Sequence, residues 1–476
     1  MANYDEIGFK CGLEIHQRLN TRKLFCHCPS MLRDDKPDFT VKRKLRAVAG
    51  ESGDVDIAAK FEMEKGLEFF YEGYNDTTCL VELDEEPIQE INQEALDITF
   101  QVALLLNARI LDEIFVMRKI VIDGSAVSGF QRTMLVAKNG ALETSKGIVR
   151  IASICLEEES AKNVEEKEDL RIWRLDRLGI PLIEIQTYPD IKDSEHAKET
   201  AEKIGMILRS TGKVLRGIGS IRQDVNLSIK NGARIEIKGF QDLRSMQKVI
   251  ENEVNRQLTL IKSGKKISPE VRKANPDFST SYLRPLPGAA RMYPETDHPT
   301  IKADSHRISK IKLPELLTEK VLRFSRQYSL NMEIARLVIN ENETLFENLI
   351  NKFKKIDPGI IAGTLALTLK DLKTRLKLNT NKLNEKDFEE VFSYLNENKI
   401  SKESIPEILV EKIKGNKIDL NKFKAVTDET LELEIKKIVD KNKSLSINAL
   451  MGEVMKLYRG KVSGQKVMEI LNKLTK

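Results

Sequence analysis

The stretches GIVRIASICLEEESAK (residues 147–162) and WRLDRLGIPLIEIQTYPDI (residues 173–191) decide the fold of the first half of this chain. Both are rich in β-branched and aliphatic residues, which suit a buried pleated surface. Each stretch therefore predicts a strand of a buried sheet, and each predicted strand contains acidic residues at positions where hydrophobic residues would be usual.

These acids are Glu184 in the second stretch and Glu157, Glu158 and Glu159 at the end of the first. An unpaired carboxylate is costly in an apolar environment, so we expect a positive group to meet Glu184. Neighbouring strand residues point to opposite faces, so the three consecutive glutamates cannot all face inward.

The N-terminal segment GLEIHQRL (residues 12–19) repeats this arrangement, because Glu14 and His16 share one face of a predicted strand. Three strands therefore carry oxygen or imidazole groups. Such donors suit a hard divalent cation such as Mg²⁺ better than structural zinc, and Mg²⁺ often accompanies a phosphate substrate. The alternative is that the acids form ordinary salt bridges with nearby arginines. The available arginines are Arg150, Arg171, Arg174 and Arg177.

The segment RGIGSIRQDVNLSIKNGARIEIKGF (residues 216–240) predicts a β-hairpin with one polar face of mixed charge. Such a face is typical of a nucleotide or phosphate site, and the alternative is a hairpin that faces solvent. Because cross-strand neighbours share a face, we predict a three-residue loop, 230–232, with Gly232 left-handed. This register pairs Ser228 with Arg234, Asn226 with Glu236, and Asp224 with Lys238.

The composition indicates a protein of several domains. A length of 476 residues favours roughly three domains. No apolar run is long enough to span a membrane, and the start MANYDEIGFK does not resemble a signal peptide. We therefore expect a soluble, cytoplasmic protein that does not bind membranes.

The five cysteines argue against a disulfide framework. Cys26 and Cys28 are close in sequence, but no second pair follows at a spacing suited to zinc. We therefore expect no zinc, and we interpret Cys11, Cys79 and Cys155 as core residues.

The net charge of +5 is concentrated at the C-terminus, because residues 401–476 contain 16 Lys and Arg against 11 Asp and Glu. A basic module of this kind is typical of a protein that binds a polyanion. The alternative is a solvated, lysine-rich surface.

The pattern changes near residue 300. Strand-like and helical runs alternate before it, whereas leucine, isoleucine and lysine recur at helical intervals after it. We predict an α+β fold with a mixed α/β domain over residues 1–299, an all-α domain over 300–405 and a small all-α tail over 406–476. Helices are predicted over residues 92–106 and 243–261, and from residue 194 to just before Gly212.

Several segments together resemble the tRNA-acting subunit of the aspartyl/glutamyl-tRNA amidotransferases. The matching segments are GLEIHQRLNTRKLFCHCPS, LEEESAK, DRLGIPLIEI, GSIRQDVNLSI, RIEIKGF, RPLPGAARMYPETD and GEVMKLYRG. LRAVAGESGDVD and RPLPGAARMYPETD are similar to the archaeal form. That form works on Glu-tRNA(Gln) with an asparaginase-like partner.

The resemblance implies a carbon-nitrogen ligase with a cradle-shaped, kinase-like domain, a helical domain and a tail domain. ATP would phosphorylate the side chain of glutamate esterified to tRNA(Gln), and ammonia would displace the phosphate. No amidase or asparaginase motif is evident, so ammonia must come from an asparaginase-like partner in a hetero-oligomer, which we expect to be a heterotetramer. The synthetase-like insertion usual before RPLPGAARMYPETD is missing here.

The resemblance also implies roles for single residues. Catalysis would involve Glu14, His16, Glu158 and Glu184. Mg²⁺ would bind His16, Glu184 and either Glu158 or Glu157, with Glu14 as a neighbour. The ATP pocket would contain Arg222, Asp224, Asn226, Glu236 and Lys238. Arg118 and Lys119 are candidates for binding the substrate or its phosphate, with surface salt bridges as the alternative.

Two alternative functions remain open at this stage. The chain could be a tRNA-binding scaffold that has lost the chemistry, or an ATP-dependent ligase acting on another carboxylate. The joint presence of Glu14, His16, Glu158 and Glu184 favours an enzyme, and the basic tail argues against a small-molecule substrate.

Overall fold

The computed structural model describes residues 3–49, 53–217, 219–240, 242–286, 292–423, 428–442, 445–458, 462 and 464–474. Residues 287–291 of RPLPGAARMYPETD, and Arg459 and Gly460 of GEVMKLYRG, lie outside these ranges. The chain divides into two compact units, Met1–Leu316 and Leu317–Lys476. The division falls after the expected boundary near residue 300, because Ile301 and Ala303 pack into the core of the first unit.

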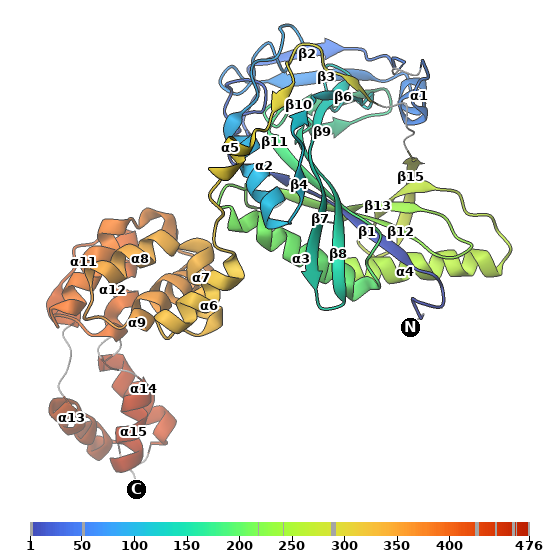
Figure 1. The fold of residues 1–476 in the computed structure, drawn as a ribbon. Coiled ribbons are helices and arrows are strands. Elements are labelled where there is room, and N and C mark those ends of the chain that lie inside the picture. Colours follow the sequence, from blue (N-terminus) through green and yellow to red (C-terminus); the bar gives the residue numbers. More distant parts are fainter. Residues whose placement is uncertain are drawn as a thin grey trace. The chain divides into compact units, whose positions relative to one another are not determined.

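The first unit is built on an 11-stranded sheet, in the order β15-β14-β13-β12-β1-β11-β8-β7-β6-β16, with β4 beside β7 (Figure 1). Its strands are β1 (Lys10–Arg18), β4 (Arg109–Ile110), β6 (Met117–Ile120), β7 (Phe130–Thr144), β8 (Gly147–Glu158), β11 (Pro181–Thr187), β12 (Ile221–Ser228), β13 (Ile235–Phe240), β14 (Glu270–Ala274), β15 (Thr280–Pro285) and β16 (Met292–Pro294). All pairs are antiparallel except β13 with β14. The predicted strands around Glu14, Glu157 and Glu184 are therefore confirmed, and they lie close together at the centre of the sheet.

Three helices, α2 (Gln93–Leu105), α3 (Ser194–Ser210) and α4 (Leu243–Lys262), pack against this sheet. Each begins after a side chain that accepts a backbone N–H of the first turn. The capping residues are Asn92, Asp193 and Asp242. After α3 the chain turns at Gly212, whose φ is 68°. The three predicted helices are thus confirmed.

The two faces of the central strands differ in character, because side chains alternate along a strand. Leu13, Ile15 and Val225 are buried in one large hydrophobic core that also contains residues of α2, α3 and α4. The opposite side of the same strands, here called the polar face, carries charged and polar side chains. The members used below are Glu14, His16, Lys119, Glu157, Glu184, Arg222, Asp224, Glu236 and Lys238.

A second sheet of four strands has the order β2-β3-β10-β9. Its strands are β2 (Phe39–Arg43), β3 (Glu68–Gly73), β9 (Lys162–Glu166) and β10 (Leu170–Arg174). Its core contains Phe69, Tyr71 and Trp173. The loop after β6 rests on these aromatic residues, since the Tyr71 hydroxyl donates to the Gly124 carbonyl at 2.8 Å. The unit also contains α1 (Ile57–Glu64), α5 (Ser305–Ser309) and the pair β5 (Glu113–Ile114) with β17 (Ile301–Lys302).

The second unit is helical throughout its described residues. Its α-helices are α6 (Leu317–Gln327), α7 (Met332–Glu341), α8 (Glu343–Lys352), α9 (Pro358–Gly363), α10 (Leu369–Thr374), α11 (Glu385–Asn396), α12 (Ile405–Lys414), α13 (Asp428–Lys441), α14 (Ile447–Tyr458) and α15 (Gly464–Leu474). A π-helical segment, Thr364–Thr368, joins α9 to α10, and short 3-10 turns occupy Thr380–Lys382, Lys402–Ser404 and Leu420–Phe423. The predicted succession of a mixed α/β part and an all-helical part is confirmed.

Two separate hydrophobic cores form in this helical unit. One contains buried residues from Val321 to Phe423, and the other contains buried residues from Leu431 to Leu471. Where the structure describes the chain, its helices are all too short or too polar to cross a lipid bilayer.

Candidate functional site

A cavity of about 820 Å³ is lined by the polar face of the large sheet. Charged side chains from β1, β6, β8, β11, β12 and β13 form much of its lining. It includes Glu14, His16, Lys119, Glu157, Glu184, Arg222, Asp224, Glu236 and Lys238. Residues separated by more than 200 positions in the chain therefore face one enclosed space.

Strand register brings these side chains together. β1 lies between β11 and β12, and His16 is paired with Glu184 on one side and with Arg222 on the other. Glu14, two residues earlier, is paired with Asp224 across the same strands. Because paired residues share a face, all five side chains lie on the polar face.

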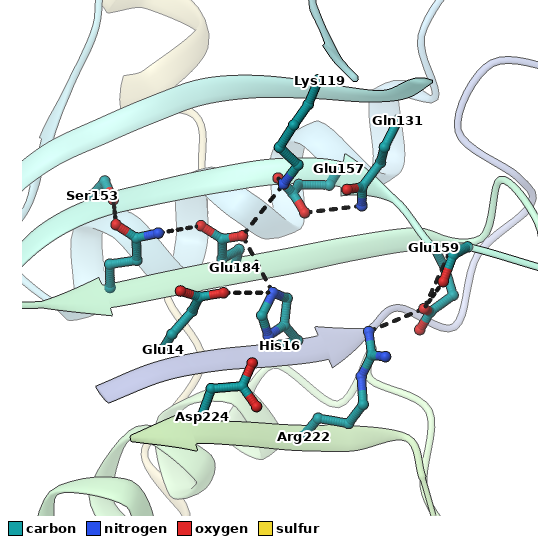
Figure 2. A network of polar contacts seen from close by, with 12 residues as sticks. Glu14, His16, Lys119, Gln131, Ser153, Glu157, Glu159, Glu184, Arg222 and Asp224 are labelled. Atoms are coloured by element: carbon teal, nitrogen blue, oxygen red, sulfur yellow. Dashed lines mark hydrogen bonds and ion pairs between the residues drawn. The ribbon is translucent and has the colours of Figure 1, made fainter. Parts of the chain in front are cut away.

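Glu14, His16 and Glu184 form a compact group at the centre of this face (Figure 2). His16 Nε2 lies 3.3 Å from Glu14 Oε1 and 3.2 Å from Glu184 Oε2. One ligand atom from each residue lies within 4.8 Å of the others. Two carboxylates and one imidazole at this spacing fit a hard divalent cation such as Mg²⁺, which prefers oxygen ligands and keeps several waters.

The electrostatics of the group reflect two close carboxylates in a partly buried place. Burial and the charge of Glu184 raise the pKa of Glu14 to about 7. Burial also opposes ionisation of Glu184, but Lys119 and His16 outweigh it and hold the pKa of Glu184 well below its usual range. Glu184 is therefore ionised, whereas Glu14 binds a proton more readily. A bound cation would favour the ionised form of both.

The three consecutive glutamates take three different positions. Glu157 lies on the polar face, where Lys119 Nζ is 2.7 Å from its Oε1 and Gln131 Nε2 donates to its Oε2 at 3.0 Å. Glu158 leaves β8 on the opposite side from Glu157 but still lines the cavity, and its Oε2 accepts the backbone N–H of Arg132 at 3.2 Å. Glu159 accepts a hydrogen bond from Arg222.

Glu158 is therefore not part of the group of Glu14, His16 and Glu184. The resemblance had implied that Glu158, or its neighbour Glu157, binds Mg²⁺ together with His16 and Glu184. The reason is strand alternation: Glu157 follows Cys155, the partner of Glu184, on the same face, and Glu158 must point to the other face. Of the two residues, Glu157 is the one near the group, and Glu14 takes the position expected for Glu158 beside His16.

The hairpin of β12 and β13 has the predicted register around Asn226, which is paired with Glu236. The strand then becomes irregular at Asp224, but Lys238 Nζ still bonds Asp224 Oδ2 at 2.6 Å and contacts Glu236 Oε1 at 2.6 Å. Arg234 donates to Asn226 Oδ1. Asp224, Glu236 and Lys238 are thus in direct contact and line the cavity with Arg222, whereas Asn226 is not among the lining residues.

The turn of this hairpin differs from the prediction. Asn231 has the left-handed conformation, with φ of 62°, and Gly232 does not. Glycine is required at 232 for another reason, because a Cβ there would lie 2.2 Å from Gln257 Oε1. Gln257 accepts the N–H of Ala233 and ties the turn to α4.

The two candidate substrate residues separate. Lys119 lines the cavity and lies 3.8 Å from Glu184 Oε2. Arg118 instead bonds Glu295 and lies over the ring of Phe130, with 4.6 Å between its Cζ and the ring centroid. Arg118 is therefore part of the framework, which agrees with the salt-bridge alternative.

A second group of possible metal ligands was not predicted from the sequence. Cys26, Cys28, Cys79 and Glu82 each offer a ligand atom within 4.8 Å of the others. Cys26 Sγ is 2.8 Å from Glu82 Oε1, and the backbone N–H of Cys79 donates to Glu82 Oε2 at 2.7 Å. The hydrogen bonds from Cys26 and Cys79 lower the pKa of Cys28. We call these four residues the Cys–Glu group.

The Cys–Glu group corrects the interpretation of Cys79 as a core residue and removes the ground for expecting no zinc. A second cysteine pair is indeed missing, but Glu82 stands three residues after Cys79 and supplies the fourth donor. The CxxE spacing of CLVE was the available signal. Three sulfurs and one carboxylate could bind a metal ion, and thiolate ligands favour zinc.

Comparisons with known proteins agree with this site. Residues 9–309 match the model of the GatB/GatE catalytic domain, and residues 344–474 match the model of the GatB domain. The E subunit of the glutamyl-tRNA(Gln) amidotransferase of Methanocaldococcus jannaschii is 40% identical, with 100% of this chain and 99% of the relative covered. The E subunits of Methanococcus vannielii and Methanosarcina barkeri are 39% and 36% identical, each with 99% of this chain and 98% of the relative covered.

The alignment with the Methanocaldococcus protein spans 626 positions although this chain has 476 residues, so at least 150 positions occur in the relative alone. A longer relative is expected if this chain lacks the synthetase-like insertion. The similarity nevertheless extends over the whole chain, and the resemblance drawn from the motifs is confirmed. The chain belongs to the GatB/GatE family.

Proposed function

We propose that this chain is the subunit of a glutamyl-tRNA(Gln) amidotransferase that converts Glu-tRNA(Gln) to Gln-tRNA(Gln) with ATP. The observation that carries this proposal is the group of Glu14, His16 and Glu184 on the polar face, beside the charged hairpin. The high coverage of the E subunits supports it, because the relatives named for this reaction align over nearly their whole length.

The reaction requires activation of an unreactive carboxylate. The side chain of glutamate becomes an electrophile only when one of its oxygens carries a phosphoryl group, which ammonia then displaces. Phosphoryl transfer depends on positioning and on neutralisation of charge. Mg²⁺ would supply that neutralisation when bound by Glu14, His16 and Glu184, with Glu157 nearby. Glu158 would position Arg132 through its salt bridge to that side chain.

Two further sets of residues have proposed roles in this cavity. Arg222, Asp224, Glu236 and Lys238 line the cavity and would bind ATP, together with Asn226, which accepts a hydrogen bond from Arg234 of the lining. Burial acts to lower the pKa of Lys238, but Asp224 and Glu236 outweigh it, so this ammonium stays charged. Lys119, close to Glu157 and Glu184, is suited to meet the charge of the substrate carboxylate or its phosphate.

Ammonia would be supplied by an asparaginase-like partner. No amidase or asparaginase motif is evident in the sequence. The relatives are named as subunits, which supports a heteromeric complex, and we propose a heterotetramer.

The chain would divide into a cradle-shaped domain over residues 1–299, a helical domain over 300–405 and a tRNA-binding tail over 406–476. The two hydrophobic cores of the second unit support a tail separate from the helical domain, and Phe423 extends the helical core past residue 405. The excess of Lys and Arg in residues 401–476 supports contact with tRNA.

The Cys–Glu group would hold a structural zinc ion. Lys23 Nζ lies 3.2 Å from Glu82 Oε1 and is fully buried, so its charge would partly balance the thiolates. Metal analysis of the purified protein tests this, with Cys79→Ser expected to lose the metal and to unfold at lower temperature.

The deciding experiment combines this chain with an asparaginase-like partner, ATP, Mg²⁺, asparagine and Glu-tRNA(Gln). We expect Gln-tRNA(Gln) to form with the wild-type protein and formation to fall at least about 1,000-fold with Glu184→Ala, since a charged ligand of the metal is lost. The matched control is Glu165→Gln, a change at an exposed position of β9 that is not among the residues lining the cavity.

Binding of Glu-tRNA(Gln) by the wild-type protein without turnover would instead indicate the tRNA-binding scaffold. Turnover of ATP with a free carboxylate, and none with Glu-tRNA(Gln), would indicate a ligase with another substrate.

A further inference from the structure

Four charged side chains meet at one end of the polar face, where β1 and β8 end and β12 begins. We call them the Glu159 cluster. Its members are Arg18, Glu159, Arg177 and Arg222. The Glu159 side chain is only 2% exposed, and Arg222 Nη2 donates to its Oε1 at 3.0 Å. One buried carboxylate is thus shared by three guanidinium groups.

Two of these arginines are held by the framework, Arg18 buried and Arg177 partly buried. Arg177 donates from Nε to the carbonyl of Ser160 at 2.8 Å and from Nη2 to the carbonyl of Ala161 at 2.6 Å, so it holds the turn that follows Glu159. Arg18 donates to the carbonyl of Gly219 at 2.7 Å.

The Nε and Nη1 atoms of Arg18 are buried and form no hydrogen bond, and the nearest balancing charge is Glu159 Oε2, 3.9 Å from Arg18 Nε. Burial acts to raise the pKa of Glu159, but the charges of Arg222, Arg177 and Arg18 outweigh it and hold that pKa below its usual range. Glu159 is therefore a permanent negative charge in this place.

Arg222 differs from the other two arginines. Its side chain is 40% exposed and lines the cavity. It lies on β12 directly opposite His16, which belongs to the group of Glu14, His16 and Glu184. Figure 2 shows Arg222 reaching along the polar face toward Glu159. Without that contact, a half-exposed arginine would sample many rotamers.

We propose that Glu159 is a positioning residue that holds the guanidinium of Arg222 at the edge of the cavity to bind a phosphate group of the nucleotide. This inference rests on the proposed function, because it requires a nucleotide in the cavity. The planar guanidinium matches phosphate oxygens, and a cation already fixed beside the metal group loses less entropy when the nucleotide binds. The buried Arg18 and the partly buried Arg177 keep Glu159 in place.

The test compares Glu159→Gln with the wild-type protein in the complete transamidation assay. Glutamine keeps the shape of the side chain but removes its charge. We expect the KM for ATP to rise about tenfold, the loss typical of one charge-assisted hydrogen bond, while kcat changes less than about twofold. Glu165→Gln, on the exposed strand β9, should leave both values unchanged.

A double variant separates positioning from a merely structural role. If Glu159 acts through Arg222, Glu159→Gln adds no further loss once Arg222 is replaced by alanine. Losses that multiply in the double variant would overturn the inference, and so would an unchanged KM in Glu159→Gln.

Circular dichroism checks that the variants are folded. If Glu159→Gln does not fold, Glu159→Asp keeps the charge but shortens its reach, and a rise of about threefold in the KM for ATP is expected. An unchanged KM in Glu159→Asp would then overturn the inference. Titration of the wild-type protein with ATP and Mg²⁺ keeps the two proposals apart. A wild-type protein that binds no nucleotide contradicts the proposed function itself, whereas normal nucleotide affinity in both Glu159 variants overturns only the role of Glu159.

Discussion

Single buried acids and their partners determine the framework behind the cavity. Glu295 is an example, because its side chain is fully buried between Arg118 and Arg132, and Arg132 Nε lies 2.7 Å from its Oε2. Burial raises the pKa of the Glu295 carboxyl, but hydrogen bonds from the two arginines and a backbone N–H outweigh it and lower that pKa to about 2. The carboxylate therefore stabilises the folded state whenever it is ionised.

The sign of the pH dependence follows from linkage. The pKa in the folded state lies below that of the unfolded chain, so the stabilisation is complete above about pH 4.5 and is lost as the pH falls toward 2. We expect Glu295→Gln to lower the free energy of unfolding at pH 7 by about 3 kcal/mol, and the difference to shrink below about pH 4.5. Urea unfolding of both proteins at several pH values measures this, and a constant difference down to pH 3 would contradict it.

Single residues also show what the sequence could reveal about the site. Glu14, His16 and Glu184 were found because each breaks an apolar strand pattern, and the structure brings them together. Glu158 looked equivalent to Glu157, since only the register of β8 against β11 decides which of them faces Glu184. The Cys–Glu group was missed because contact between Cys28 and Cys79 depends on the path of a long connection.

At the scale of elements, local signals were strong where a cap and a periodic pattern agreed. The helices α2, α3 and α4 begin and end within about one residue of prediction, and Asn107, with φ of 51°, ends the turn after α2 as expected. The order of the strands could not be predicted in the same way. β13 and β14 pair in parallel and β1 enters between two late strands, and neither fact leaves a local pattern.

The loop between β6 and β7 illustrates close contact between elements. Gly124 has φ of 90°, and a Cβ there would lie 2.2 Å from Phe69 and 2.7 Å from Trp173 Nε1. Gly129, in the same loop, has φ of 77°, but its nearest neighbour would be Ile122 at 3.4 Å. Replacement by alanine would strain the backbone at both positions, because both have positive φ. Only at Gly124 would the added Cβ also clash with neighbouring side chains.

We therefore expect Gly124→Ala to lower the free energy of unfolding by about 3 kcal/mol and Gly129→Ala by about 1 kcal/mol, because only the first adds overpacking to strain. Chemical denaturation of the two variants measures both values. Equal losses would show that packing against the aromatic residues of the second sheet is unimportant.

At the scale of the whole molecule, the two units have independent hydrophobic cores. Every residue of the core behind the polar face lies before Leu317, and the cores of the helical unit contain only later residues. The cavity lining also belongs entirely to the first unit. The part of the chain that forms the cavity should therefore fold without the helices of the second unit.

We expect a protein truncated after Leu316 to fold, to bind ATP and Mg²⁺ within about threefold of the full chain, and to lose most of its affinity for tRNA. The basic tail would supply that affinity through phosphate contacts, so tRNA binding by the full chain should weaken steeply with salt. Calorimetry with ATP and filter binding with tRNA measure the two affinities. Unchanged tRNA affinity in the truncated protein would place recognition in the first unit.

The position of β1 has a consequence for synthesis of the protein. This strand leaves the ribosome before both of its partners, residues 182–186 and 221–228, which follow about 170 to 210 residues later. At a typical elongation rate, the partner strands of Leu13 and Ile15 would be synthesised on the order of 10 to 40 seconds after these two residues. Until the first partner emerges, the nascent chain exposes an apolar strand with two free edges, and molecular chaperones are expected to bind it there.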